Sequence, residues 1–137
     1  MQLIKTQTVY RQNIKKLAVS KPKYFYFATF GLTVDKYLDG ILKALPKNCD
    51  VRILIGVKPT CTKKQIDFFK YYFRNYKLKI SKSSHLKMVA TNNGSLMGGM
   101  NYTNSDWADS AWLMKLPKAC KLTKNYFEVI WKSKRSS

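Results

Sequence analysis

The residues best suited to chemistry in this sequence lie in the stretch from His85 to Asn101, which reads HLKMVATNNGSLMGGMN. It holds the only histidine of the chain, and Lys87 follows two positions later. Residues two apart on a β-strand point to the same face, so the imidazole and the ammonium group are expected to act together. Histidine serves as a nucleophile or a general acid and base near neutral pH, whereas lysine and asparagine bind phosphate oxygens. The stretch therefore predicts chemistry on a phosphate ester.

A tight turn is expected to bring the two halves of this stretch together. Asn93-Gly94 is typical of a two-residue β-hairpin turn, because both central residues of that turn need positive φ angles. Simple pairing about this turn places Tyr102 opposite His85 and turns Asn101 to the other face. A one-residue bulge at Gly98-Gly99 is predicted to correct the face. These glycines are also expected to let a bulky anion approach the backbone.

The same stretch resembles the signature of the phospholipase D superfamily, often called the HKD motif. That signature is His-x-Lys, then an aspartate, then Gly-Gly or Gly-Ser followed by x-Asn. The matching residues here are His85, Lys87, Gly98, Gly99 and Asn101. Asn92 stands where the family has its aspartate, a structural residue that supports the catalytic ones, and the spacing from Asn92 to the glycines is one residue shorter than the common form.

The resemblance implies a mechanism that needs no metal or other cofactor. His85 would attack phosphorus in line to form a phosphohistidine, while Lys87 and Asn101 would stabilise charge on the phosphoryl oxygens. A second histidine would protonate the leaving oxygen and later activate water. Because the chain contains one histidine, the active form is expected to be a homodimer whose two motifs meet at a two-fold axis.

Other residues near the motif are candidates for supporting roles. Asp109 is expected to orient the catalytic histidine through its second ring nitrogen, with a capping or turn role as the alternative. Ser84 and Thr103 flank the motif and, together with Gly98 and Gly99, are candidates for binding the substrate phosphate. A hydrogen bond at the end of a strand is the alternative role for Ser84 and for Thr103.

The charge of the chain predicts a polyanionic partner. There are 26 Lys and Arg residues against 7 Asp and Glu residues, which gives a net charge of +19. Nucleic acid is the expected partner, DNA before RNA, and no stable membrane association is expected.

A metal-dependent nuclease is the competing enzyme class, but it needs clustered carboxylates or histidines, and only Asp106 and Asp109 lie close to the motif. The three cysteines form no CxxC pair, which argues against zinc and disulfides and favours a cytoplasmic location, the host cytoplasm for a viral protein.

The elements that must position the motif follow a β-α-β-α-β order. Apolar runs predict strands at 24–30, 51–57, 76–81 and 110–115, and apolar stripes predict helices at 34–45, 63–75 and 124–133. Thr33, Thr60 or Thr62, and Thr123 are the expected N-caps of these helices. The prediction is an α/β fold with a mixed, mostly parallel central sheet flanked by helices, similar to phospholipase D. Residues 1–22 are expected to form a basic N-terminal arm, and residues 23–137 a phospholipase D-like nuclease domain.

These inferences together predict a metal-independent endonuclease that hydrolyses nucleic acid as a homodimer. The main alternative is a basic nucleic-acid-binding protein that has kept the scaffold and lost activity, which Asn92 in place of the aspartate and the small size support. A phospholipase or phosphatidyl transferase is a third possibility.

Overall fold

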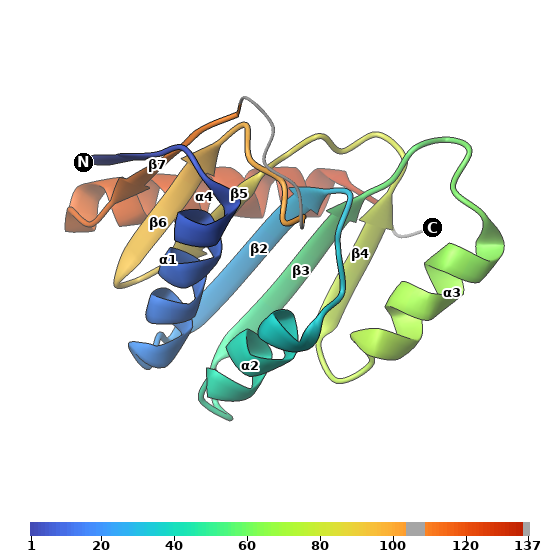
Figure 1. Cartoon of the computed structure of the whole chain (residues 1–137), viewed down its shortest axis with the longest axis horizontal. Helices are drawn as coiled ribbons and strands as arrows, with labels where there is room; N and C mark the ends of the chain where they lie inside the picture. The colour runs from blue at the N-terminus through green and yellow to red at the C-terminus, as the bar shows by residue number, and fades with distance from the viewer. Residues whose placement is uncertain (104–108, 136–137) are drawn as a thin grey trace.

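The computed structural model describes residues 1–103 and 109–135, and these form a seven-stranded mixed sheet with four helices (Figure 1). The strands are β1 (Gln2–Ile4), β2 (Tyr24–Phe30), β3 (Asp50–Gly56), β4 (Lys77–Ser81), β5 (Met88–Thr91), β6 (Gly94–Gly98) and β7 (Ala111–Met114). The helices are α1 (Gln7–Val19), α2 (Lys36–Ala44), α3 (Lys63–Tyr72) and α4 (Pro117–Ser133).

The strands follow the order β1-β7-β6-β5-β2-β3-β4. The α/β class and the mixed sheet are as predicted, and β2, β3 and β4 are parallel because α2 and α3 cross between them. The sheet is not mostly parallel, however. The other pairings among the described strands, β1·β7, β7·β6, β6·β5 and β5·β2, are antiparallel. The short connection between β5 and β6 allows only an antiparallel hairpin.

Each face of the sheet has its own apolar core. Helices α1, α2 and α3 pack on one face, against side chains such as Phe25, Phe27 and Ile53. Helix α4 covers the other face, where the ring of Phe127 stacks on Tyr26 with centroids 4.9 Å apart. β2 lies between the two cores and is buried on both sides, which explains its unbroken apolar sequence.

Residues 1–22, which the sequence predicted as a basic N-terminal arm, form β1 and α1. β1 pairs with β7 at one edge of the sheet, and α1 packs beside α2 (Figure 1). The α1 side chains of Tyr10, Ile14 and Leu17 are buried in the main core. These residues are four and three positions apart, so they lie on one face of the helix. Burial of this apolar face stabilises the packing of α1 on the sheet.

Two helices begin at residues other than those predicted. α2 is capped by Asp35, whose carboxylate accepts a hydrogen bond from the Leu38 N–H, and not by Thr33. α4 begins at Pro117, because proline suits the first turn of a helix, where its missing N–H has no partner to lose. Thr123 therefore lies inside α4, where its hydroxyl donates to backbone carbonyl oxygens of the preceding turn. The prediction that Thr62 caps α3 is confirmed.

Within residues 1–103 and 109–135, none of the helices has both the length and the apolar character needed to cross a membrane.

Candidate functional site

The β5–β6 hairpin carries the motif, and its turn lies one residue earlier than predicted. Thr91 pairs with Gly94, so Asn92 and Asn93 form the turn, and neither has a positive φ angle. The Thr91 hydroxyl accepts a hydrogen bond from the Asn93 N–H at 3.1 Å and donates to the Gly94 carbonyl at 2.8 Å. A side-chain hydroxyl thus closes this turn and replaces the positive-φ geometry that Asn-Gly predicted.

The bulge predicted at the two glycines is absent from this hairpin, because the pairing of β5 with β6 ends at Met88 opposite Met97, before Gly98. The pairing of β6 with β7 runs without interruption to Gly98 opposite Ala111, and the Gly99 N–H continues it by donating to Ser110 O at 2.8 Å. A β-carbon on Gly98 would lie 2.4 Å from that same carbonyl oxygen. Close packing of β7 therefore requires glycine at position 98. This requirement does not depend on the approach of an anion to the backbone.

His85 and Lys87 lie in the segment between β4 and β5, before the strand begins, so the strand argument for their common face does not apply. They nevertheless line one hollow of about 440 Å³. The imidazole of His85 is exposed and packs on the ring of Phe30, the last residue of β2, with centroids 4.5 Å apart. The other residues of the hollow are Ser83, Ser84, Leu86, Met97, Gly98, Tyr126, Ile130 and Lys134.

The hollow is electropositive. Lys87 contributes one ammonium group, and Lys134, just beyond the end of α4, contributes another. Lys134 is held by hydrogen bonds from its Nζ to the hydroxyl and the carbonyl oxygen of Ser83, at 3.2 and 3.4 Å. None of the ion pairs in the part of the chain that the structure describes involves His85 or Lys87. An anionic group entering the hollow would therefore meet cations that no carboxylate neutralises.

Asn101 reaches this edge of the sheet because the chain leaves β6 after Gly98 and crosses to the end of β2. Its side-chain oxygen accepts hydrogen bonds from the Phe30 N–H at 2.8 Å and from the Thr29 hydroxyl at 3.4 Å. The Thr29 hydroxyl also donates to the Gly31 carbonyl at 2.7 Å, so the Phe30 N–H is the donor that mainly fixes the amide. The amide nitrogen makes no hydrogen bond within residues 1–103 and 109–135, and Asn101 is not among the residues that line the hollow around His85.

Helix α1 supports the Asn101 segment, a role that sequence reasoning missed. The side chain of Gln7 donates to the backbone carbonyl of Asn101 and accepts from the Thr103 N–H at 3.4 Å. One turn further along, Arg11 donates to the carbonyl of Thr103. In the sequence, nothing distinguishes these two residues from other polar residues of an amphipathic helix, because their partners lie more than 90 positions away.

Arg11 also joins a polar cluster beneath the segment. It pairs with Asp35 at 2.7 Å and lies over the Tyr102 ring, 4.3 Å from its centroid. The Tyr102 hydroxyl donates to Asp35 at 2.9 Å, and burial together with that carboxylate raises the pKa of the tyrosine. Partial burial opposes ionisation of Asp35, but hydrogen bonds from Leu38, Tyr102 and Arg11 outweigh it and lower the pKa of this carboxyl.

The remaining predicted site residues are placed differently from expectation. Thr103, Asp109 and Asn101 line a small cavity of about 80 Å³ with Gln7 and Met100. Asp109 lies against Gly99, and no hydrogen bond joins it to His85 in the described residues. Ser84 borders the hollow, but its side chain is buried and its hydroxyl accepts from the Leu86 N–H at 3.4 Å. Asp106 lies outside the described residues.

Asn92 lies at the opposite end of β2 from His85, so it does not support His85 or Lys87 directly. Its side-chain oxygen accepts a hydrogen bond from the Lys23 N–H at 2.8 Å, just before β2 begins. His85 packs on Phe30, where β2 ends, and a seven-residue strand is about 20 Å long. Asn92 therefore joins the hairpin turn to the start of the central strand.

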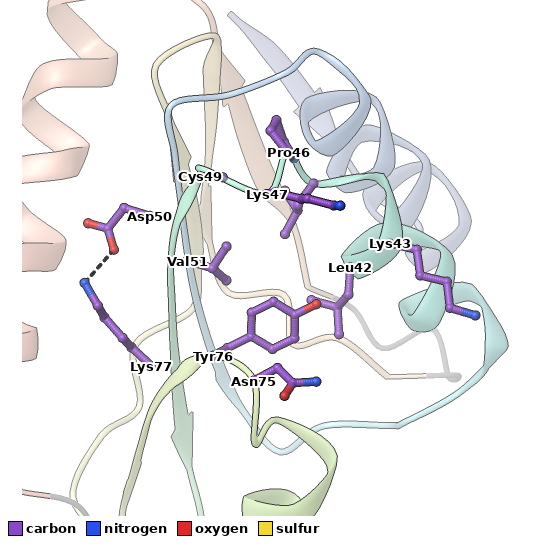
Figure 2. Close-up of a pocket in the computed structure, with 11 residues that line it drawn as sticks. Leu42, Lys43, Pro46, Lys47, Cys49, Asp50, Val51, Asn75, Tyr76 and Lys77 are labelled. Carbon is purple, nitrogen blue, oxygen red and sulfur yellow. Dashed lines mark hydrogen bonds and ion pairs between the residues drawn. The ribbon is translucent and has the colours of Figure 1, made fainter.

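A second hollow, of about 460 Å³, lies at this opposite edge of the sheet (Figure 2). Its one carboxylate, Asp50, is already paired with Lys77 and Arg52, each at 3.0 Å. Burial, with the nearby Asp50, raises the pKa of the Cys49 thiol to about 11, which makes this sulfur a poor nucleophile at neutral pH. This hollow is therefore a weaker candidate for chemistry than the one around His85.

No group of three or more His, Cys, Asp or Glu side chains that could hold a metal ion is found among residues 1–103 and 109–135.

The comparisons with known proteins point to one fold. No family model and no curated protein matches the chain. The solved structure of Nuc from Salmonella typhimurium, a phospholipase D family member, superposes with a TM-score of 0.71 at 17% identity, covering 92% of this chain and 91% of that one. NucT from Helicobacter pylori superposes with a TM-score of 0.74 at 12% identity, covering 99% of this chain and 98% of that one. TrmBL2, an archaeal chromatin protein, gives 0.69 at 14% identity, covering 99% of this chain and 53% of its own.

The chain therefore has the fold of phospholipase D family members, in agreement with the resemblance of its motif. In this fold the carboxyl ends of the parallel strands β2, β3 and β4 meet at one edge, and the antiparallel hairpin brings His85 and Lys87 to the same edge. Ligands of α/β sheets bind outside the carboxyl ends of the strands, which is where these residues lie.

Proposed function

We propose that this protein is a metal-independent phosphodiesterase that hydrolyses nucleic acid, with DNA the favoured substrate. The observation that carries the proposal is the position of His85, exposed in a hollow with Lys87 and Lys134 and not paired with a carboxylate in the described residues. An imidazole beside two cations suits attack on an anionic phosphodiester.

The proposed reaction is the one that the resemblance to phospholipase D implies. A ring nitrogen of His85 attacks phosphorus, an N–P bond forms, and the P–O bond to the leaving oxygen breaks. Lys87 and the amide N–H groups of Asn101 stabilise the charge on the non-bridging oxygens. The leaving oxygen takes a proton from a general acid, which then accepts a proton from water as that water breaks the N–P bond. The products are a phosphomonoester and an alcohol, with His85 regenerated.

One chain alone does not supply the general acid that protonates the leaving oxygen. The sequence has one histidine, so a second imidazole must come from His85 of the partner subunit. We therefore propose a homodimer in which the two hollows face each other across a two-fold axis. The exposure of His85 at the edge of the sheet is compatible with such an approach.

Nucleic acid is the proposed substrate because of the charge. A net charge of +19 on 137 residues attracts polyanions strongly at physiological salt. TrmBL2, which shares the fold, is described as binding DNA. The same likeness favours the second candidate function, a nucleic-acid-binding protein without activity, because it shows that this fold also occurs in a chromatin protein.

The first experiment measures cleavage of plasmid DNA and of single-stranded RNA in excess EDTA. Wild type is compared with His85→Ala and Lys87→Ala, and with Lys47→Ala as the control, because Lys47 is an exposed lysine of the hollow at the opposite edge. Cleavage that persists in EDTA, is lost in the first two variants and is kept in the third supports the proposal. Lack of cleavage by the wild type, with salt-sensitive binding retained, supports the binding protein, and release of lipid head groups supports a phospholipase.

The dimer is tested by sedimentation together with the dependence of rate on protein concentration. A two-histidine site between subunits predicts that activity per chain falls on dilution below the dissociation constant of the dimer. A monomer with constant activity per chain at all concentrations would exclude the shared site while leaving the hydrolase proposal open.

A further inference from the structure

Helix α3 exposes two aromatic side chains, Phe68 and Tyr71. None of its residues is fully buried, although Ile66, Phe69 and Tyr72 pack partly against the core. The rings of Phe68 and Tyr71 are 51% and 67% exposed. Large apolar rings turned toward solvent on a marginally packed helix indicate a binding surface when a groove and a suitable charge lie beside them.

Two adjoining hollows form a groove from Phe30 to Phe68. One hollow, of about 500 Å³, begins at Phe30, the residue whose ring contacts His85. A second hollow, of about 420 Å³, extends to Phe68. The two hollows share Leu32, Gln65 and Phe69, so they adjoin along the first turns of α3.

The charge along this groove is positive. Lys58 lines the first hollow and Lys64 lines the second, and neither belongs to an ion pair within the described residues. The nearest acid on the helix, Asp67, is paired with Lys63 at 3.2 Å. A groove that combines unpaired cations with an exposed aromatic ring complements a strand that carries both phosphates and bases.

We infer that this groove binds an unpaired nucleic-acid strand on one side of the scissile phosphate, with a base stacked on Phe68 and phosphates contacting Lys58 and Lys64. The inference rests on the proposed function where it places the scissile phosphate at His85. Binding of the strand in the groove does not require catalysis. Here the groove defines the substrate class as single-stranded nucleic acid or a single-stranded extension of a duplex.

The unpaired form is selected by the geometry of stacking. The Phe68 ring contacts the rings of Phe69 and Tyr72 and remains half-exposed. In a duplex both faces of an internal base are covered by its neighbours, so the exposed part of this ring can stack on such a base only after the base has left the helix. An exposed aromatic accepts the π-face of any base, and one such contact contributes about 1–3 kcal/mol, which corresponds to roughly 5- to 150-fold in affinity. Preference for single strands without preference for sequence is the expected consequence.

The test measures affinity for a short single-stranded oligonucleotide and for the same sequence as a blunt duplex. All variants carry His85→Ala and are studied in EDTA, so that cleavage does not interfere. Phe68→Leu keeps apolar volume but removes the aromatic face, and it is expected to weaken single-strand binding about fivefold or more while leaving duplex binding unchanged. Phe68→Trp should retain the single-strand affinity.

A charge variant and a control complete the test. Lys64→Ala should lower the slope of log affinity against log salt by about 0.7 for the single strand, the effect of losing one phosphate contact. Lys47→Ala removes the same charge at the opposite edge of the sheet and should not change the preference for single strands. Thermal melts of each variant establish that the fold is intact.

Several results would overturn the inference. They are equal losses for single strand and duplex in Phe68→Leu, an unchanged affinity, or no binding of either oligonucleotide by the parent protein. A shift in the monomer–dimer equilibrium with unchanged affinity would assign the groove to a second copy of the chain. If the wild type does not cleave in EDTA but Phe68→Leu loses single-strand affinity, the proposed hydrolase fails while the groove is supported.

Discussion

The side-chain oxygen of Asn101 accepts a hydrogen bond from the backbone N–H of Phe30 at 2.8 Å. This contact joins the end of the motif to the end of the central strand, and Phe30 also carries the ring on which His85 packs. The side-chain oxygen also accepts from the Thr29 hydroxyl at 3.4 Å, so both contacts tie Asn101 to the end of β2. The two halves of the motif therefore meet through β2, without direct pairing across the hairpin.

Asn101→Asp tests this arrangement. The carboxylate can accept the same hydrogen bonds from Phe30 and Thr29, so the melting temperature should change little. It cannot donate to a phosphate oxygen and adds a repulsive charge, so kcat should fall by about 100- to 1,000-fold, the usual effect of removing one stabilising donor. The measurement is the rate of oligonucleotide cleavage beside a thermal melt. Unchanged kcat with an intact fold would remove Asn101 from the proposed mechanism.

Gly56→Ala should be strongly destabilising, because a β-carbon at this position would lie 1.9 Å from the carbonyl oxygen of Ser84. The contact involves backbone on both sides, so relief requires the segment before His85 to move. We expect a loss of about 3 kcal/mol or more in the free energy of unfolding.

Gly40→Ala is the matched control for that substitution. Gly40 lies inside α2, and its added β-carbon would meet only the Lys15 ammonium nitrogen, at 3.7 Å. Alanine has the higher helix propensity, so this variant should gain about 0.5–1 kcal/mol. Urea unfolding of both variants measures the difference, and effects of the same sign would contradict the packing argument.

Asn92→Asp introduces the aspartate that the phospholipase D signature has at this position. The substitution should neither raise nor lower kcat strongly. Asn92 lies at the far end of β2 from His85 and accepts a hydrogen bond from Lys23. Aspartate keeps that acceptor, so kcat should stay within about twofold of wild type. Asn92→Ala should instead cost about 0.5–1.5 kcal/mol of stability. A large gain in kcat in the aspartate variant would show that asparagine limits activity from a distance.

Acid should weaken the cluster beneath the Asn101 segment through Asp35. Hydrogen bonds hold the pKa of this carboxyl below that of the unfolded chain, so ionised Asp35 stabilises the fold at pH values above about 4. This stabilisation disappears as the pH falls through the lowered pKa of the folded state. The difference in unfolding free energy between wild type and Asp35→Asn should therefore shrink below about pH 4. Urea titrations across that range provide the measurement, and a difference independent of pH would contradict the assignment.

The sequence by itself determined the elements that depend on local pattern. The unbroken apolar run from Tyr24 to Phe30 predicted a strand, and the structure has that strand with the same bounds, buried on both faces. The apolar stripe in residues 34–45 predicted a helix, and α2 forms there with Leu38, Ile41 and Leu42 buried. The motif His85-x-Lys87 and the excess of basic residues pointed to phosphate chemistry because residue type alone carries charge and nucleophilicity.

Only the tertiary structure decided how these parts meet. The turn at Asn92-Asn93 is closed by Thr91 and anchored by Ser20 and Lys23, and such distant partners leave no periodic trace in the sequence. The placement of Lys134 in the hollow required α4 to cross the sheet, and the support of Asn101 by Gln7 required α1 to pack beside it. Hydrogen bonds and ion pairs form between groups that are near in space, whereas a sequence pattern reports mainly which side of its own helix or strand a residue occupies.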